Sequence, residues 1–315
     1  MNRRAFLASL STTLAGAASR LPANRNIKWA LSAALWHHYK PVPFTDILDV
    51  MKDTGFIGVR VTGFPGCLKT YNLTAAQMEK EVSRRGLHVV TISFNAESHD
   101  PARHAQVLAD ARAAMEFLRG FGASRLVVFS PGRRKPGEDV DAAFRVMCAC
   151  FNRIGELAGE MGFQAGIHNH LDQMVESPEE VHRCLAMTDP KLFHFAPDTA
   201  HLHLAGANVV EMFERYKHRI MFLDYKDARW TTPAADVVLE NGTVHKRESQ
   251  AARFFSSIYD LGDGEIDFPA CHRILKGIGY KGWICVDLDT ARNGPRASYE
   301  RCGAYVVNRL EPIYS

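Results

Sequence analysis

Several common signatures are missing from the 315-residue sequence, and each absence excludes a class of protein. The seven cysteines are scattered and include no C-x-x-C pair, which argues against a disulfide framework and against a thiolate metal site. Neither a serine nucleophile elbow nor a glycine-rich phosphate loop is present. The formal net charge is only +3, and the densest basic group, Arg133-Arg134-Lys135, is too short to form a nucleic-acid-binding stripe. What remains is an ordinary globular composition, 46% hydrophobic and 23% charged, without a nucleic acid partner.

The first twenty residues, MNRRAFLASLSTTLAGAASR, differ in kind from the rest. Arg3 and Arg4 precede a mildly apolar run that reaches Ala18, and small residues fit for cleavage follow. This pattern resembles a twin-arginine export signal, and it predicts that residues 1–24 are a signal and that the protein is exported or periplasmic. The alternative is an unprocessed amphipathic N-terminus. The run is too short and too rich in Ser, Thr and Gly to form a stable membrane span.

Beyond the signal, short β-branched runs alternate with amphipathic helical patterns. We predict strands at residues 28–35, 57–63, 88–94, 125–130, 164–170, 192–198, 220–226 and 283–289. A helical pattern follows each strand, and the one beginning SPEEV at Ser177 has a typical N-terminal signature, with proline and two acids in its first turn. Eight such units predict a single α/β domain over residues 25–315, a closed (β/α)8 TIM barrel rather than an open sheet. A polar insertion within residues 227–282 is expected to be a mobile excursion near the barrel mouth.

Potential metal ligands occur at the ends of the last four predicted strands. Side chains alternate along a strand, and the active site of such a barrel lies at the carboxyl ends of its strands. One side chain from each strand can therefore converge on the axis: His168, Asp198, Asp224 and Asp287. Three buried carboxylates would repel each other, and a divalent cation relieves that repulsion. Mixed oxygen and nitrogen ligands suit one Mn²⁺, Mg²⁺, Co²⁺ or Zn²⁺ ion.

Each of these residues also has a simpler interpretation. An Asp that closes a strand is often the N-cap of the following helix, and a lone His is often only hydrogen-bonded. We assign Asp227 and Asp289 to such roles, as caps or ion-pair partners. Lys226 either neutralises the acidic cluster or polarises a substrate oxygen. Four possible ligands at consecutive strand ends are harder to explain as caps alone.

The second half of the chain resembles a known family. The stretches GFQAGIHNHLDQMVESPEEV, MTDPKLFHFAPDTAHLHLAGAN, FLDYKDAR and LGDGEIDFPACHRILKGIGYKGWICVDLD are similar, in order and approximate spacing, to the sugar phosphate isomerase/epimerase superfamily of xylose-isomerase-like barrels, and closest to inosose dehydratases. The first half, from residue 27, matches only in its alternation of strand and helix patterns. The resemblance implies one divalent metal held by Glu, Asp, His and Glu from the last four strands.

The sequence departs from that ligand set at three of four positions. His168 stands where relatives carry Glu, Asp224 where they carry His, and Asp287 where they carry the last Glu. Only Asp198, in DTAH, is kept as written. The resemblance therefore still implies the metal, while the proton-transfer roles of the missing glutamates pass to other groups.

Other residues are candidates for catalysis or substrate binding. Besides Asp287 as a ligand and base, His170 and His201 are candidate proton carriers, and Lys226 could stabilise an oxyanion. Three residues near the first strands are candidate substrate contacts, with ordinary packing or surface pairing as the alternative: Trp36, His38 and Arg60.

These features predict a metal-dependent isomerase or epimerase that acts on a sugar or keto-sugar through an enediolate. A lyase that removes water from a keto-sugar or inosose by the same chemistry is the first alternative, and a sugar-binding barrel without turnover is the second. The expected partner is a small carbohydrate, and self-association as a homo-oligomer is left open. An endonuclease-IV-like repair function uses more metal ligands, and an export signal with near-neutral charge argues against it.

Overall fold

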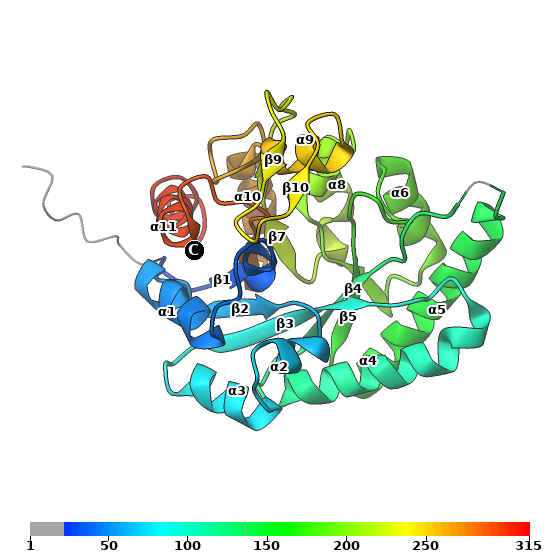
Figure 1. Cartoon of the computed structure of the whole chain (residues 1–315). Coiled ribbons are helices and arrows are strands. Elements are labelled where there is room, and N and C mark those ends of the chain that lie inside the picture. Colours follow the sequence, from blue (N-terminus) through cyan, green and yellow to red (C-terminus); the bar gives the residue numbers. More distant parts are fainter. Residues whose placement is uncertain (1–21, 136) are drawn as a thin grey trace, which may run out of the picture.

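The computed structural model describes residues 22–135 and 137–315, which form a (β/α)8 barrel (Figure 1). Eight strands make a parallel sheet in the order β6-β5-β4-β3-β2-β1-β12-β7. Their bounds are β1 Ile27–Ser32, β2 Gly58–Val61, β3 His88–Asn95, β4 Arg125–Phe129, β5 Gln164–His168, β6 Phe193–Phe195, β7 Leu223–Tyr225 and β12 Gly282–Val286. Single bridges between Phe195 and Ile220 and between Asp198 and Asp224 close the ring from β6 to β7. The predicted barrel is confirmed, with each strand within a few residues of its expected place.

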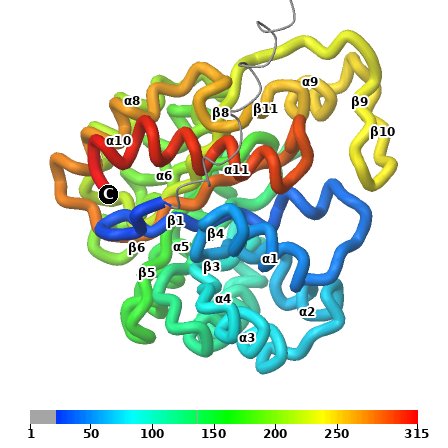
Figure 2. The backbone as a smooth tube through the Cα atoms, turned by 90° about the vertical axis from the view of Figure 1, so that its left-hand side faces the viewer, coloured from blue at the N-terminus to red at the C-terminus, as the bar shows by residue number. Residues whose placement is uncertain are grey.

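Helices surround this barrel (Figure 2). Their bounds are α1 Phe44–Thr54, α2 Gly66–Thr70, α3 Ala75–Ser83, α4 His104–Arg119, α5 Val140–Glu160, α6 Pro178–Met187, α7 Thr199–Leu204, α8 Val209–Tyr216, α10 Phe268–Gly277 and α11 Pro295–Tyr305. The sequence signals at their ends are used as expected: Ser177 caps α6 and forms a capping box with Glu180, with Pro178 in the first turn. The last helix, α11, packs beside α1, so the two ends of the barrel chain meet (Figure 1).

The core lies between the strands and the inner faces of the helices. The strands are almost wholly buried, as expected when helices cover a parallel sheet. Aromatic pairs join the two layers, for example Phe151 of α5 stacked on Phe193 of β6 with ring centroids 4.9 Å apart. All seven cysteines are free and buried, so they are small apolar residues of this core, as their spacing indicated.

The insertion between β7 and β12 contains regular structure. Its elements are β8 Asp227–Ala228, β9 Val237–Val238, β10 Val244–His245, α9 Gln250–Ser257 and β11 Ile258–Tyr259. The β9–β10 hairpin and α9 lie together over one end of the barrel (Figure 1). The backbone N–H of Asn241 donates to the carbonyl of His38 at 2.9 Å. The segment expected as an excursion is thus found at the mouth, and there it folds into a hairpin and a helix.

Within the described residues, no helix is both long and apolar enough to cross a membrane. The predicted export signal falls at residues 1–24, of which 1–21 lie outside the part of the chain that the structure describes.

Candidate active site with a possible metal centre

Three of the four predicted ligands meet at the carboxyl ends of β5, β6 and β7. His168, Asp198 and Asp224 are fully buried, and each offers one ligand atom within 4.8 Å of the other two. The imidazole Nε2 of His168 lies 3.7 Å from Asp198 Oδ2, and its Nδ1 lies 3.3 Å from Asp224 Oδ2. Both interpretations of Asp198 hold at once: Oδ1 accepts the N–H of His201 as the N-cap of α7, while Oδ2 faces the other ligands.

The open atoms of these side chains match what a cation requires. Within the described residues, Asp198 Oδ2 and both carboxylate oxygens of Asp224 are buried without a hydrogen bond; their cationic neighbours are Lys226, 3.0 Å from Asp198 Oδ2, and Arg60, 3.3 Å from Asp224 Oδ1. His168 donates from Nδ1 to the carbonyl of Ala196 at 3.1 Å, which leaves a lone pair on Nε2 facing Asp198. A lone pair and unsatisfied carboxylate oxygens repel one another, and a metal ion would accept all of them. The residues present therefore fit a divalent cation.

The fourth predicted ligand, Asp287, is held instead by two buried cations. Its Oδ2 lies 2.9 Å from Arg60 and 2.6 Å from the ammonium of Lys226. Arg60 also contacts Asp224 at 3.3 Å, and Lys226 also contacts Asp198 at 3.0 Å and Asp289 at 2.7 Å. Asp287 thus lies beside the group of three rather than in it, and Lys226 has the geometry of a neutralising group.

The balance of buried charge leaves a deficit of positive charge. The four carboxylates of this network (Asp198, Asp224, Asp287 and Asp289) face the two cations Arg60 and Lys226, which leaves two negative charges. Burial raises the pKa of Asp198 to about 6 and that of Asp224 to about 7, against the pull of Lys226 and Arg60. Although burial opposes it, Lys226 and Arg60 hold the pKa of Asp287 well below its usual value. The uncompensated charge is therefore concentrated on Asp198 and Asp224.

A second pair of histidines stands next to this centre, and the backbone of Leu171 contacts both rings. His170 donates from Nδ1 to the carbonyl of Leu171 at 2.7 Å, which leaves its Nε2 free to accept a proton. The backbone N–H of Leu171 donates to Nδ1 of His201 at 3.2 Å, and Nε2 of His201 lies 3.3 Å from the ammonium of Lys226, so both ring nitrogens of His201 face donors. The two rings lie 3.8 Å apart, centroid to centroid. Burial lowers both pKa values, so each imidazole is neutral.

The three candidate substrate contacts lie in three different parts of the structure. Trp36 is buried in the core and stacks on Tyr299, with ring centroids 5.9 Å apart. Arg60 lies within the acidic network, where Ser93 accepts from its Nη1 at 2.7 Å. His38 lies at the mouth, and its ring meets Phe255 of the insertion at 4.8 Å.

Some residues of the site were not predicted from the sequence. Phe254 of α9 stacks on His201, with ring centroids 5.3 Å apart, and so forms part of the wall. Asn169 holds β5 to β6: its side chain accepts from Asp198 N–H at 3.0 Å and donates to Asp198 O at 3.2 Å. The aromatic pair in ARFFSS was the only sequence signal for Phe254, and it did not indicate which residue Phe254 would contact.

Comparison with known proteins identifies the family. A family profile described as "Xylose isomerase-like TIM barrel" matches residues 43–302. The chain belongs to this family. Among curated proteins, it is 25% identical over 307 residues to the inosose dehydratase of Lactiplantibacillus plantarum, covering 91% of this chain and 98% of that one. It is 29% identical over 185 residues to the inosose dehydratase of Bacillus velezensis, where the match spans 55% of this chain and only 60% of that enzyme's length.

Several solved structures of other proteins share the fold at low sequence identity. The IOLI protein with a binding zinc atom superposes with a TM-score of 0.70 at 13% identity, covering 91% of this chain and 99% of that one. A probable 3-DHS dehydratase, AsbF, from Bacillus anthracis gives 0.69 at 13% identity, covering 90% and 99%. An L-ribulose 3-epimerase gives 0.67 at 13% identity, covering 91% and 95%. Proteins named as a probable dehydratase and as an epimerase thus share this fold.

Proposed function

We propose that this chain is a divalent-metal-dependent dehydratase that acts on an inosose-type cyclic keto-sugar. The observation that carries the proposal is the buried His168–Asp198–Asp224 group with its open ligand atoms. The curated relatives, named inosose dehydratases, support the lyase alternative over the isomerase or epimerase that the sequence placed first. The zinc atom in a relative's structure supports the metal.

His168, Asp198 and Asp224 would hold the metal, with Asp287 close by. When bound, a divalent ion supplies Lewis acidity that lowers the energy of an enediolate beside the substrate ketone. The ligand types suit Mn²⁺, Co²⁺, Mg²⁺ or Zn²⁺. Lys226 and Arg60 keep Asp287 ionised and in place, because each cation contacts the same carboxylate oxygen.

The two remaining histidines supply the proton transfers. His170 removes the proton from the carbon next to the ketone through Nε2, and the C–H electron pair forms a carbon–carbon double bond as the π pair of the ketone moves onto its oxygen. As the ketone re-forms, the carbon–carbon double bond moves one carbon along and the C–O bond of the hydroxyl on that next carbon breaks. A proton from the His201–Lys226 pair, whose Nε2 and Nζ lie 3.3 Å apart, lets this hydroxyl leave as water. The resulting enol tautomerises to a 1,2-dione. The overall change is the loss of one water without oxidation or reduction.

The decisive experiment combines metal analysis with product identification. We expect the purified protein to hold about one equivalent of a divalent metal, and an inosose to lose one water with Mn²⁺ or Co²⁺ present. Mass spectrometry would report a product lighter by one water. Stoichiometric metal with an unchanged inosose would refute the dehydratase, and protein that neither holds nor is stabilised by metal would favour a sugar-binding barrel.

The second candidate is an isomerase or epimerase of a keto-sugar. It is supported by the structural likeness to an L-ribulose 3-epimerase and by the shared enediolate chemistry. In D₂O, this reaction would place deuterium on the product carbon while the number of oxygens stays constant. A labelled product that retains all of its oxygens would replace the dehydratase with this function.

We further propose that residues 1–24 direct export by the twin-arginine route, on the strength of Arg3-Arg4 and the apolar run that follows. Fused to a reporter, this segment is expected to carry it to the periplasm. Changing both arginines to lysine should keep the reporter in the cytoplasm, and export unaffected by that change would refute the proposal.

A further inference from the structure

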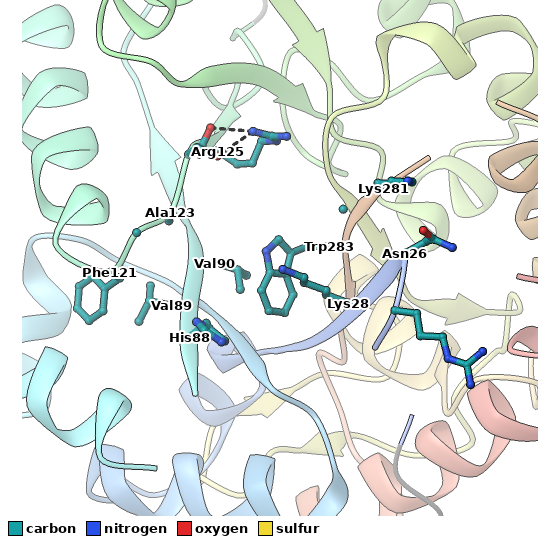
Figure 3. A pocket seen from close by; sticks show the side chains of 14 residues that line it. Asn26, Lys28, His88, Val89, Val90, Phe121, Ala123, Arg125, Lys281 and Trp283 are labelled. Carbon is teal, nitrogen blue, oxygen red and sulfur yellow. Dashed lines mark hydrogen bonds between the residues drawn. The ribbon is translucent and has the colours of Figure 1, made fainter. Parts of the chain in front are cut away.

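A cavity of about 620 Å³ opens at the amino-terminal ends of the strands, opposite the candidate active site. It is bounded by the first residues of β1, β3, β4 and β12 and by the loop 121–124 before β4 (Figure 3). Its volume lies within the range of small-molecule sites. Strand β12, for example, begins at Gly282 in this basal cavity and ends at Val286, beside Asp287 of the candidate active site, so the two sites lie at opposite ends of the barrel.

The charge of the basal cavity is entirely positive. Four cationic side chains line it (Arg25, Lys28, Arg125 and Lys281), and no carboxylate does. Among residues 22–135 and 137–315, no Asp or Glu forms an ion pair with any of these four side chains. Several other arginines of the chain do have a carboxylate partner. Like charges gathered without a counter-charge repel each other, and a bound anion would relieve that repulsion.

Arg125 is already fixed for such a role. Its Nε donates to the carbonyl of Met221 at 3.2 Å, and its Nη1 donates to Ser124 Oγ at 2.9 Å. Within the described chain, its Nη2 makes no hydrogen bond, so that edge of the guanidinium is free for a ligand. An arginine held in place loses little conformational entropy when it binds a planar or tetrahedral anion.

The cavity also offers a flat apolar surface. The indole of Trp283 lies beside Lys28, whose ammonium is 5.7 Å from the ring centroid, and the ring of His88 is 5.8 Å away (Figure 3). Gly58 of β2, on the far side of β1 from β12, makes room for this indole, because a Cβ at residue 58 would lie 2.5 Å from Trp283 Cζ3. Val90, Phe121 and Ala123 extend the apolar lining.

We propose that the basal cavity binds an organic phosphate that carries a flat ring, the chemistry of a nucleoside monophosphate. The four cations would hold the phosphate, and Trp283 would stack on the ring. The inference does not depend on the proposed dehydratase, because it uses none of that site's residues.

Calorimetric titration with AMP, adenosine and inorganic phosphate tests the proposal on the full chain. EDTA is included so that no metal at the candidate active site can bind phosphate. We expect AMP to bind more tightly than either fragment, because it alone presents both the charge and the ring. In the double variant Lys28→Gln/Lys281→Gln, the Kd for AMP should rise about tenfold or more.

The matched control is Lys52→Gln/Lys69→Gln, which removes two exposed lysines outside the cavity and should leave the Kd unchanged. Trp283→Leu should weaken AMP binding but not inorganic phosphate binding. The proposal is overturned if AMP does not bind, if adenosine binds as tightly as AMP, or if Lys28→Gln/Lys281→Gln binds AMP as the unmodified chain does.

Discussion

Asp198 has two tasks that use different oxygens, so one substitution can separate them. Asn can still cap α7, but it cannot supply the negative charge that a metal ligand needs. We expect Asp198→Asn to lose most bound metal and all detectable turnover while keeping its circular dichroism spectrum. The matched control is Asp267→Asn at the N-cap of α10, which should keep both metal and activity. Equal metal content in Asp198→Asn and the unmodified chain would remove Asp198 from the ligand set.

His170 and His201 have different hydrogen-bond partners and different proposed roles, so their substitutions should cause different losses. His170→Gln removes the base, so we expect both solvent deuterium exchange next to the ketone and dehydration to fall by roughly 10²- to 10⁴-fold. His201→Gln removes only the acid, so exchange should continue while dehydration falls by a similar factor. NMR of an inosose in D₂O measures both rates. If His201→Gln stops the exchange and His170→Gln does not, the two roles are reversed.

At the scale of elements, Asp227 organises the loop that follows β11. Its carboxylate accepts backbone N–H groups from Gly262, Gly264 and Ile266, at 2.8, 3.0 and 3.3 Å. A Cβ at residue 264 would lie 2.2 Å from Asp227 Oδ1 and 2.8 Å from the backbone nitrogen of Ala228. The prediction that Asp227 serves structure rather than chemistry agrees with these contacts.

Gly264→Ala should therefore lower the free energy of unfolding by about 2 kcal/mol, because the backbone must shift to admit the methyl group. Gly277→Ala is the control: its Cβ meets nothing within 4 Å, and alanine is the better residue in α10. Urea denaturation would compare the two. If the Gly264→Ala protein is as stable as the Gly277→Ala protein, the loop admits the methyl group without a cost in stability, and the prediction is wrong.

Local sequence patterns of single elements decide which parts of the fold could be predicted from the sequence. Strand and helix positions follow from local periodicity and end signals, such as Ser177 before α6, and these were predictable. The structure of the insertion could not be predicted, because it depends on contacts between residues that are far apart in the sequence. Phe254 reaches His201, and Asn241 reaches His38, across separations that no local pattern reports.

At the scale of the molecule, strand alternation and barrel geometry were enough to bring His168, Asp198 and Asp224 together. They were not enough to place Asp287. Whether its carboxylate faces the other acids or a cation depends on where Arg60 and Lys226 extend, from β2 and from beyond β7. Long side chains decide that in three dimensions, so sequence spacing cannot assign ion pairs.

The unpaired charge of the site makes a prediction for the stability of the whole barrel. Two buried negative charges in excess of Arg60 and Lys226 oppose folding, and a divalent ion bound only by the folded chain offsets them. Free metal at about 100 times its Kd should add about 2.7 kcal/mol and raise the Tm by roughly 5 °C. Differential scanning calorimetry with EDTA, and then with Mn²⁺, Co²⁺ or Zn²⁺, measures the shift. Asp198→Asn should lose most of it, because that variant lacks one ligand and one of the two excess charges. A shift of equal size in that variant would place the stabilising ion elsewhere on the protein.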